Sequence, residues 1–158
     1  MAEPRFASPI PAAVEDFGAV QLVDESTRLK WRIWEDLFGV GLGRGRRFGD
    51  SLAFSVSPGE WIVLGDRPDG GEVVDITHVR AAMRLTGPGA RALLGRVCAL
   101  DLSDAMTPDL AAARTLVAGV ATELVRDDVE GEPSYLLLMS RSFAQSVHER
   151  LVAAAQQS

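Results

Sequence analysis

The alternation of apolar and polar residues predicts that much of the chain forms short strands. In residues 27–34, TRLKWRIW, the apolar Leu29, Trp31 and Ile33 alternate with basic residues, as in a half-buried strand. The sequence SPGE, between two further strand-like segments, predicts a tight turn at Pro58-Gly59. The predicted strands cover residues 20–25, 27–34, 51–56, 60–65, 80–87, 113–128 and 134–140.

Apolar residues at helical spacing predict helices at residues 87–100 and 142–155. The first of these helices has a proline near its first turn, where the missing N–H costs nothing. Ser140 or Ser142 is the expected N-cap of the second helix. Residues 34–42, WEDLFGVGL, predict a third helix that is short and ends in glycines.

The order strand, helix, strand, turn, strand occurs twice, with residues 58–65 (PGEWIVLG) and 132–139 (EPSYLLLM) in equivalent places. This order predicts an α+β protein made of two related strand-helix-strand-strand halves, with antiparallel sheets and helices packed on one sheet face. The N-terminal residues have little periodicity, and we expect a flexible arm over residues 1–18. A single domain then covers residues 19–158, with sub-halves at about 19–72 and 73–158.

Composition narrows the class of protein without naming a function. The 158 residues are close to the ~150 typical of one domain, and 47% hydrophobic with 24% charged residues is ordinary for a globular protein. The net charge of −6 disfavours binding to nucleic acid or to an anionic membrane. The sequence contains no long apolar run and no signal-peptide pattern. We therefore expect a soluble, cytoplasmic protein.

Residues with obvious chemistry are few. The lone Cys98 lies on the apolar face of its predicted helix, where a free cysteine usually packs as a small hydrophobe. We expect His148 on the exposed surface of the last helix, and His78 has no second histidine nearby with which to bind a metal. The loop carboxylates are expected to be solvated; they are Asp101, Asp104, Asp109, Asp127 and Asp128. The residues thus predict no catalytic centre and no metal site.

Two features indicate contacts with another protein. Residues 39–49, GVGLGRGRRFG, are followed by a strand, whereas a nucleotide-binding loop needs a helix N-terminus there, so we expect a flexible loop whose arginines hold an acidic partner surface. Trp31 and Trp34 are too close to share one strand face, so one is expected inward and the other outward, where it can anchor an interface. The candidate partner contacts are Trp31, Trp34, Arg44, Arg46, Arg47 and Arg141.

Several short motifs share their order with a known superfamily. They are Asp75-Ile76-Thr77-His78, Thr86-Gly87-Pro88-Gly89-Ala90, Leu93-Leu94 and Asp101-Leu102. This order resembles the folate-binding aminomethyltransferase superfamily, which includes the glycine-cleavage T-protein. Two later motifs, Arg114-Thr115-Leu116 and Arg141-Ser142-Phe143-Ala144, resemble the gamma subunit of heterotetrameric sarcosine oxidase. The resemblance extends from about Val20 to the C-terminus.

The resemblance implies a T-protein-like N-terminal fold and a role as an accessory, non-catalytic gamma-type subunit. Such a complex uses flavins to demethylate sarcosine to glycine and transfers the one-carbon unit to tetrahydrofolate. Its partners would be alpha, beta and delta subunits, with FAD, FMN, NAD and tetrahydrofolate on the larger chains and zinc with the delta chain. No cofactor is expected on this chain. The resemblance does not determine the substrate, because it extends to related oxidases and demethylases of other N-methylated amines.

The same resemblance allows an alternative function for this chain. T-proteins have an aspartate pair in the long strand, one of which serves the folate chemistry, and Thr122 and Glu123 stand at the corresponding positions here. A stand-alone folate-binding protein or aminomethyltransferase-like enzyme would use Glu123, Asp101 and His78 as remnants of a folate site. An orphan regulatory interaction module is a third possibility.

Overall fold

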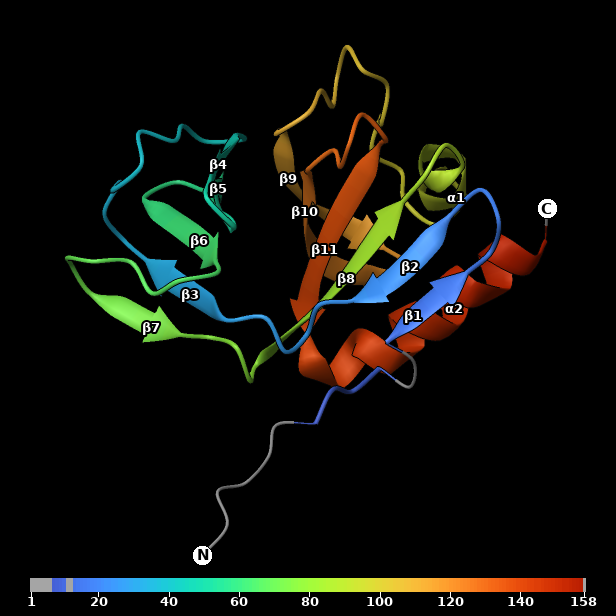
Figure 1. Ribbon diagram of the computed structural model, residues 1–158, viewed down its shortest axis with the longest axis horizontal. Coiled ribbons are helices and arrows are strands. Elements are labelled where there is room, and N and C mark those ends of the chain that lie inside the picture. The colour runs from blue at the N-terminus through green and yellow to red at the C-terminus, as the bar shows by residue number, and fades with distance from the viewer. Residues whose placement is uncertain (1–6, 11–12, 158) are drawn as a thin grey trace, which may run out of the picture.

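Two antiparallel sheets make up most of the molecule (Figure 1). The computed structural model describes residues 7–10 and 13–157. The six-stranded sheet contains, in spatial order, β1 (Val14–Asp16), β2 (Gln21–Asp24), β8 (Arg80–Thr86), β11 (Ser134–Ser140), β10 (Val120–Arg126) and β9 (Ala112–Val117). The five-stranded sheet contains β4 (Gly45–Phe48), β5 (Ser51–Ser57), β6 (Glu60–Leu64), β3 (Lys30–Ile33) and β7 (Val73–Asp75).

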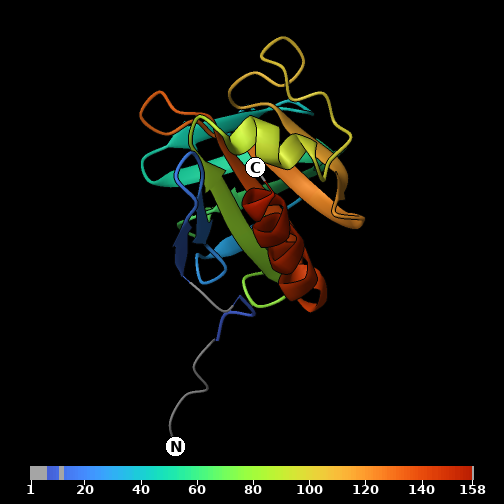
Figure 2. The ribbon, with the colours of Figure 1, turned by 90° about the vertical axis from the view of Figure 1, so that its right-hand side faces the viewer.

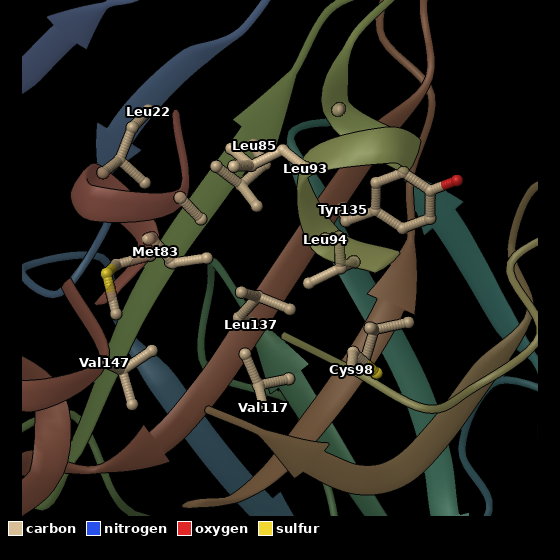
Figure 3. Packing of buried hydrophobic residues seen from close by; sticks show 14 of the residues in the cluster. Leu22, Met83, Leu85, Leu93, Leu94, Cys98, Val117, Tyr135, Leu137 and Val147 are labelled. Atoms are coloured by element: carbon tan, nitrogen blue, oxygen red, sulfur yellow. The ribbon is translucent and has the colours of Figure 1, made fainter. Parts of the chain in front are cut away.

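Two helices cover one face of the six-stranded sheet, as Figure 2 shows from that side. They are α1 (Ala90–Gly95) and α2 (Ala144–Gln156), and a 3₁₀ turn at Arg141–Phe143 leads into α2. Leucines of α1 and Val147 of α2 pack on Met83, Leu137 and Tyr135 of the sheet (Figure 3). Helices on one sheet face and an α+β class are therefore confirmed. Ser140 precedes the 3₁₀ turn but makes no capping hydrogen bond.

The opposite face of the six-stranded sheet packs on the five-stranded sheet. The two faces follow from strand alternation, because successive residues on β11 point to opposite sides. Leu137 and Met139 face the helices, whereas Leu136 and Leu138 join Phe54 in the cluster between the sheets. A strand that is buried on both faces needs a continuous apolar run, which explains the sequence SYLLLMS.

The predicted helix at residues 34–42 is wrong. These residues form bends across the outer face of the five-stranded sheet, where Phe38 stacks on Phe48 with ring centroids 4.5 Å apart. The Asp36 carboxylate accepts hydrogen bonds from the backbone N–H groups of Phe38 and Val40, both at 3.1 Å. Such side-chain bonds give the backbone an alternative to a helix.

The predicted strand at residues 113–128 is also wrong, since it is a hairpin. Val117 of β9 pairs directly with Val120 of β10, so Ala118 and Gly119 form a two-residue turn. Both have positive φ angles, 50° and 80°, as a type I′ turn requires.

Each sheet contains residues from both predicted sub-halves, because β2 pairs with β8 in the six-stranded sheet and β3 pairs with β7 in the five-stranded sheet. Val14–Asp16, inside the expected flexible arm, form β1, whereas residues 1–6 and 11–12 of that arm lie outside the described residues. Within the described part, the structure contains no helix that is long and apolar enough to span a membrane.

Candidate functional site

Glu123 is a buried carboxylate on the inner face of the six-stranded sheet. It lies on β10 two residues before Val125, which belongs to the cluster between the sheets, and alternate strand residues share a face. Its side chain is only 2% exposed. A buried carboxylate is costly unless a cation or hydrogen-bond donors compensate it.

Two arginines of the same sheet supply that compensation. The Nη2 of Arg80, on β8, donates to Oε1 of Glu123 at 2.9 Å. The Nη2 of Arg114, directly opposite on β9, lies 3.7 Å from the same oxygen. The other oxygen, Oε2, is buried and has no hydrogen-bond partner in the structure. The cluster therefore has one unused acceptor and an arginine, Arg114, whose side chain is half exposed.

The other two predicted folate-site residues lie in different surroundings from Glu123. Asp101 is exposed in the loop after α1, where the backbone N–H of Ser103 holds the pKa of this carboxyl below its usual value. His78 is exposed in the turn before β8 and borders a surface hollow together with Ser140 and Arg141. The three residues thus occupy three separate settings: a buried strand, an exposed loop and an exposed turn.

Lys30 is a buried ionisable residue that the sequence did not reveal. Alternation predicts an outward side chain, but Lys30 is fully buried, which corrects that reading. Its Nζ donates to the carbonyl oxygens of Ser26 at 2.6 Å and Arg28 at 2.8 Å. Burial lowers the pKa of Lys30 to about 8. The only signal in the sequence is that this residue is the single lysine among 16 basic residues.

Arginines and loop carboxylates connect the two sheets. Arg47 of β4 donates from Nε to Asp127 and from Nη2 to Asp109, both at 2.5 Å, while Arg84 of β8 donates to Asp127 at 2.9 Å. Asp127 is 13% exposed and Asp128 is 21% exposed. The prediction of solvated loop acids is therefore wrong for this pair. Arg47 and Arg84, far away in the sequence, hold Asp127, whereas Arg126, two residues earlier, holds Asp128.

The segment predicted as a flexible arginine loop is partly a strand. Residues Gly45–Phe48 form β4, and the Arg46 guanidinium donates to the carbonyl of Phe38 at 2.9 Å. Arg44 is exposed and lies beside β9 through an isolated bridge to Ala111.

The remaining candidate partner contacts are two tryptophans and Arg141. Trp31 is buried, with its indole N–H bonded to the carbonyl of Gly65 at 2.9 Å, whereas Trp34 is 47% exposed. The predicted split between an inward and an outward tryptophan is confirmed. Arg141 donates to the carbonyl of Ala7 at 2.6 Å.

Cys98 is buried, as predicted, but His148 is not on the surface. The prediction for His148 is wrong because α2 packs on β1 at this point. Its Nε2 bonds to the Glu15 carboxylate at 2.5 Å, and only 7% of its side chain is exposed. Among the residues that the structure describes, no group of three or more histidine, cysteine or acidic side chains is placed to hold a metal ion.

Comparisons with known proteins were made by sequence and by structure. No protein-family model and no curated protein matches the sequence. The structure is similar to a chain of the heterotetrameric sarcosine oxidase from Corynebacterium sp. U-96, solved in complex with pyrrole 2-carboxylate, with a TM-score of 0.76 and 19% identity. The match covers 92% of this chain and 88% of that chain. This chain has the same fold.

A second similar structure is the glycine cleavage system aminomethyltransferase T from Bartonella henselae, with a TM-score of 0.62 and 14% identity. The match covers 83% of this chain but only 45% of that one, so the chain spans less than half of the transferase. The T-protein-like fold predicted from the motifs is confirmed.

Proposed function

We propose that this chain is an accessory, non-catalytic subunit of a multi-subunit, flavin-dependent oxidase of N-methylated amines, with sarcosine as the leading substrate. The main support is the end-to-end match with a chain of a heterotetrameric sarcosine oxidase, which covers about nine-tenths of both chains. A fold that matches over about nine-tenths of both chains fits the same place in an assembly. Its role would be to bind and stabilise the larger subunits.

The chemistry of the described residues is consistent with an accessory role. The acidic residues suggested for folate chemistry are distributed over separate settings, and Glu123 is already bound by Arg80. In this proposal FAD, FMN, NAD and tetrahydrofolate bind to the alpha and beta subunits and zinc to the delta subunit. Stable subunit interfaces of this kind bury ~2,000 Å² or more.

A co-purification experiment tests the proposal. The chain is tagged and co-expressed with the reading frames next to its gene, and the eluate is examined for flavin absorbance in amounts stoichiometric with the chain. We expect a flavoprotein to elute with the chain. Recovery of the tagged chain alone would contradict the proposal.

Glu123 supports a second candidate, a stand-alone folate-binding protein or transferase. Its Oε2 is buried without a partner, so it has the capacity to accept one hydrogen bond from a ligand N–H. Titration of the isolated chain with a reduced folate, followed by tryptophan fluorescence, separates the candidates. A saturable change that Glu123→Gln abolishes would favour this second function, and no change would remove it.

A further inference from the structure

An apolar hollow of about 230 Å³ lies where the two helices meet the turn between β1 and β2. The C-terminal end of α2 packs beside α1 there (Figure 2). The hollow is lined by Phe17 of the turn, by Ala92 and Leu93 of α1 and by Ala155 of α2. Among the described residues that line it, Arg96 is the only charged one. The hollow is therefore preformed and carries a single positive charge at its side.

The charge of Arg96 is held in place without being neutralised. Its Nη1 donates to the carbonyl oxygen of Ala154, near the end of α2, at 2.7 Å. Most arginines of the described chain form an ion pair with an acidic side chain. Arg96 forms none with the residues that the structure describes, although it is exposed. Its remaining N–H groups can therefore bind a carboxylate from outside the chain.

A second, shallower hollow lies on the other side of Arg96, between the end of α1 and the β9–β10 hairpin. Leu116, which is 58% exposed, contributes an apolar side chain to it, and Arg150 of α2 contributes a second positive charge. Arg150 is exposed, and within the described part of the chain it forms no ion pair. Because both hollows include Arg96, they form one continuous surface, which we name the α1 surface.

The α1 surface differs in charge from the rest of the molecule. The chain has 22 acidic and 16 basic residues, but none of the described residues that line the two hollows is acidic. Exposed apolar groups beside charged ones are typical of protein–protein interfaces. Two arginines without acidic partners favour a negatively charged partner surface. Apolar hollows on both sides of Arg96 favour a polypeptide with apolar side chains over a ligand that carries charge alone.

We propose that the α1 surface binds an acidic, apolar segment of a partner subunit. One apolar side chain of that segment would enter the hollow beside Leu93, as an anchor residue does at the centre of an interface. A neighbouring carboxylate would bind Arg96, and a second apolar side chain would cover Leu116. The inference rests on the proposed accessory function and names the surface that the partner uses.

Competition for a place in the complex tests the inference. Wild-type chain and a variant are co-expressed with the neighbouring reading frames, and mass spectrometry of the purified complex measures their ratio. Ala92→Phe fills the hollow from an exposed position of α1, so it should keep the circular dichroism of the wild type. We expect its incorporation to fall at least about ten-fold, and that of Ala92→Ser, which leaves the hollow open, to stay at the wild-type level.

Charge reversal tests the acidic character of the partner segment. Arg150→Glu changes an exposed side chain, and we expect its incorporation to fall at least about three-fold. Arg150→Lys keeps the charge and should be incorporated like the wild type. Arg67→Glu makes the same charge change in an exposed loop of the five-stranded sheet and should also have no effect.

The outcomes separate this inference from the proposed function. A complex that incorporates Ala92→Phe and Arg150→Glu as well as the wild type would overturn the inference and leave the proposed function intact. If no complex forms, both fail. An isolated chain that dimerises, and that Ala92→Phe makes monomeric, would assign the α1 surface to a second copy of the chain and contradict the proposal.

Discussion

The pKa of Lys30 shows how strongly the surroundings of one side chain can change its ionisation. It is fully buried and bonded to two carbonyl oxygens, and burial lowers its pKa from the 10.5 of a solvated lysine to about 8. Between those pH values the unfolded state binds more protons than the folded state. The free energy of unfolding should therefore rise by up to about 3 kcal/mol as the pH increases from 8 to 10.5. Below pH 8 the buried lysine is protonated, and its full destabilising effect is present.

Urea unfolding across pH 7 to 10.5 measures this effect. Lys30→Met should flatten the rise, because the other titrating groups are the same in both proteins. Equal slopes for the wild type and the variant would refute the assignment.

Asp127 is the second residue whose role depends on distant partners. It accepts hydrogen bonds from Arg47 of one sheet and Arg84 of the other, so its carboxylate bridges the two sheets. Asp127→Ala should lower the free energy of unfolding by about 2–4 kcal/mol, because it leaves a buried arginine with fewer partners. Asp69→Ala is the control, since Asp69 is exposed in a loop, and it should change stability by less than about 0.5 kcal/mol. Similar melting curves for both variants would contradict this account.

These residues could not be predicted from sequence pattern. The Lys30 side chain turns back to carbonyl groups of the turn that precedes β3, which strand alternation cannot indicate. Asp127 looks like a loop acid, and its arginines lie 80 and 43 residues away in the sequence. The burial of Cys98 was predicted correctly, but for a different reason: the helix predicted to extend to residue 100 ends at Gly95, and Cys98 is buried in an isolated bridge to Val117 of β9.

At the scale of elements, the stability of the hairpin between β9 and β10 depends on the two residues of its turn. Ala118 adopts a positive φ of 50°, which costs a side-chain-bearing residue energy, whereas Gly119 adopts 80° freely. Ala118→Asn creates the Asn-Gly pair that favours type I′ turns and should stabilise the protein by about 0.5–1 kcal/mol. Gly119→Ala should destabilise it by about 1 kcal/mol. Denaturant midpoints measure both changes, and shifts of the opposite sign would rule out this turn.

The same hairpin explains why one long strand was predicted. Ala-Gly is not a strong turn signal, and apolar residues continue on both sides of it. The pairing of Val117 with Val120 reverses the chain and shifts the alternation of faces there. The strands with one clear pattern, such as β8 and β11, were located correctly from the sequence.

At the scale of the whole molecule, the sequence predicted the class of fold better than its details. Antiparallel sheets with helices on one face follow from alternation and from the leucine-faced helix, and the fold matches the one that the motifs suggest. The pairing of β2 with β8 brings both sub-halves into one sheet. That pairing depends on contacts distant in the sequence, so the sheet boundaries did not follow from local pattern.

The most direct test of the accessory function is the mass of the assembly that the chain forms. Native mass spectrometry of the chain co-expressed with its neighbouring reading frames should detect a stable complex with a fixed subunit ratio and bound flavin. A chain that stays monomeric beside an intact, active flavoprotein would contradict the proposed function.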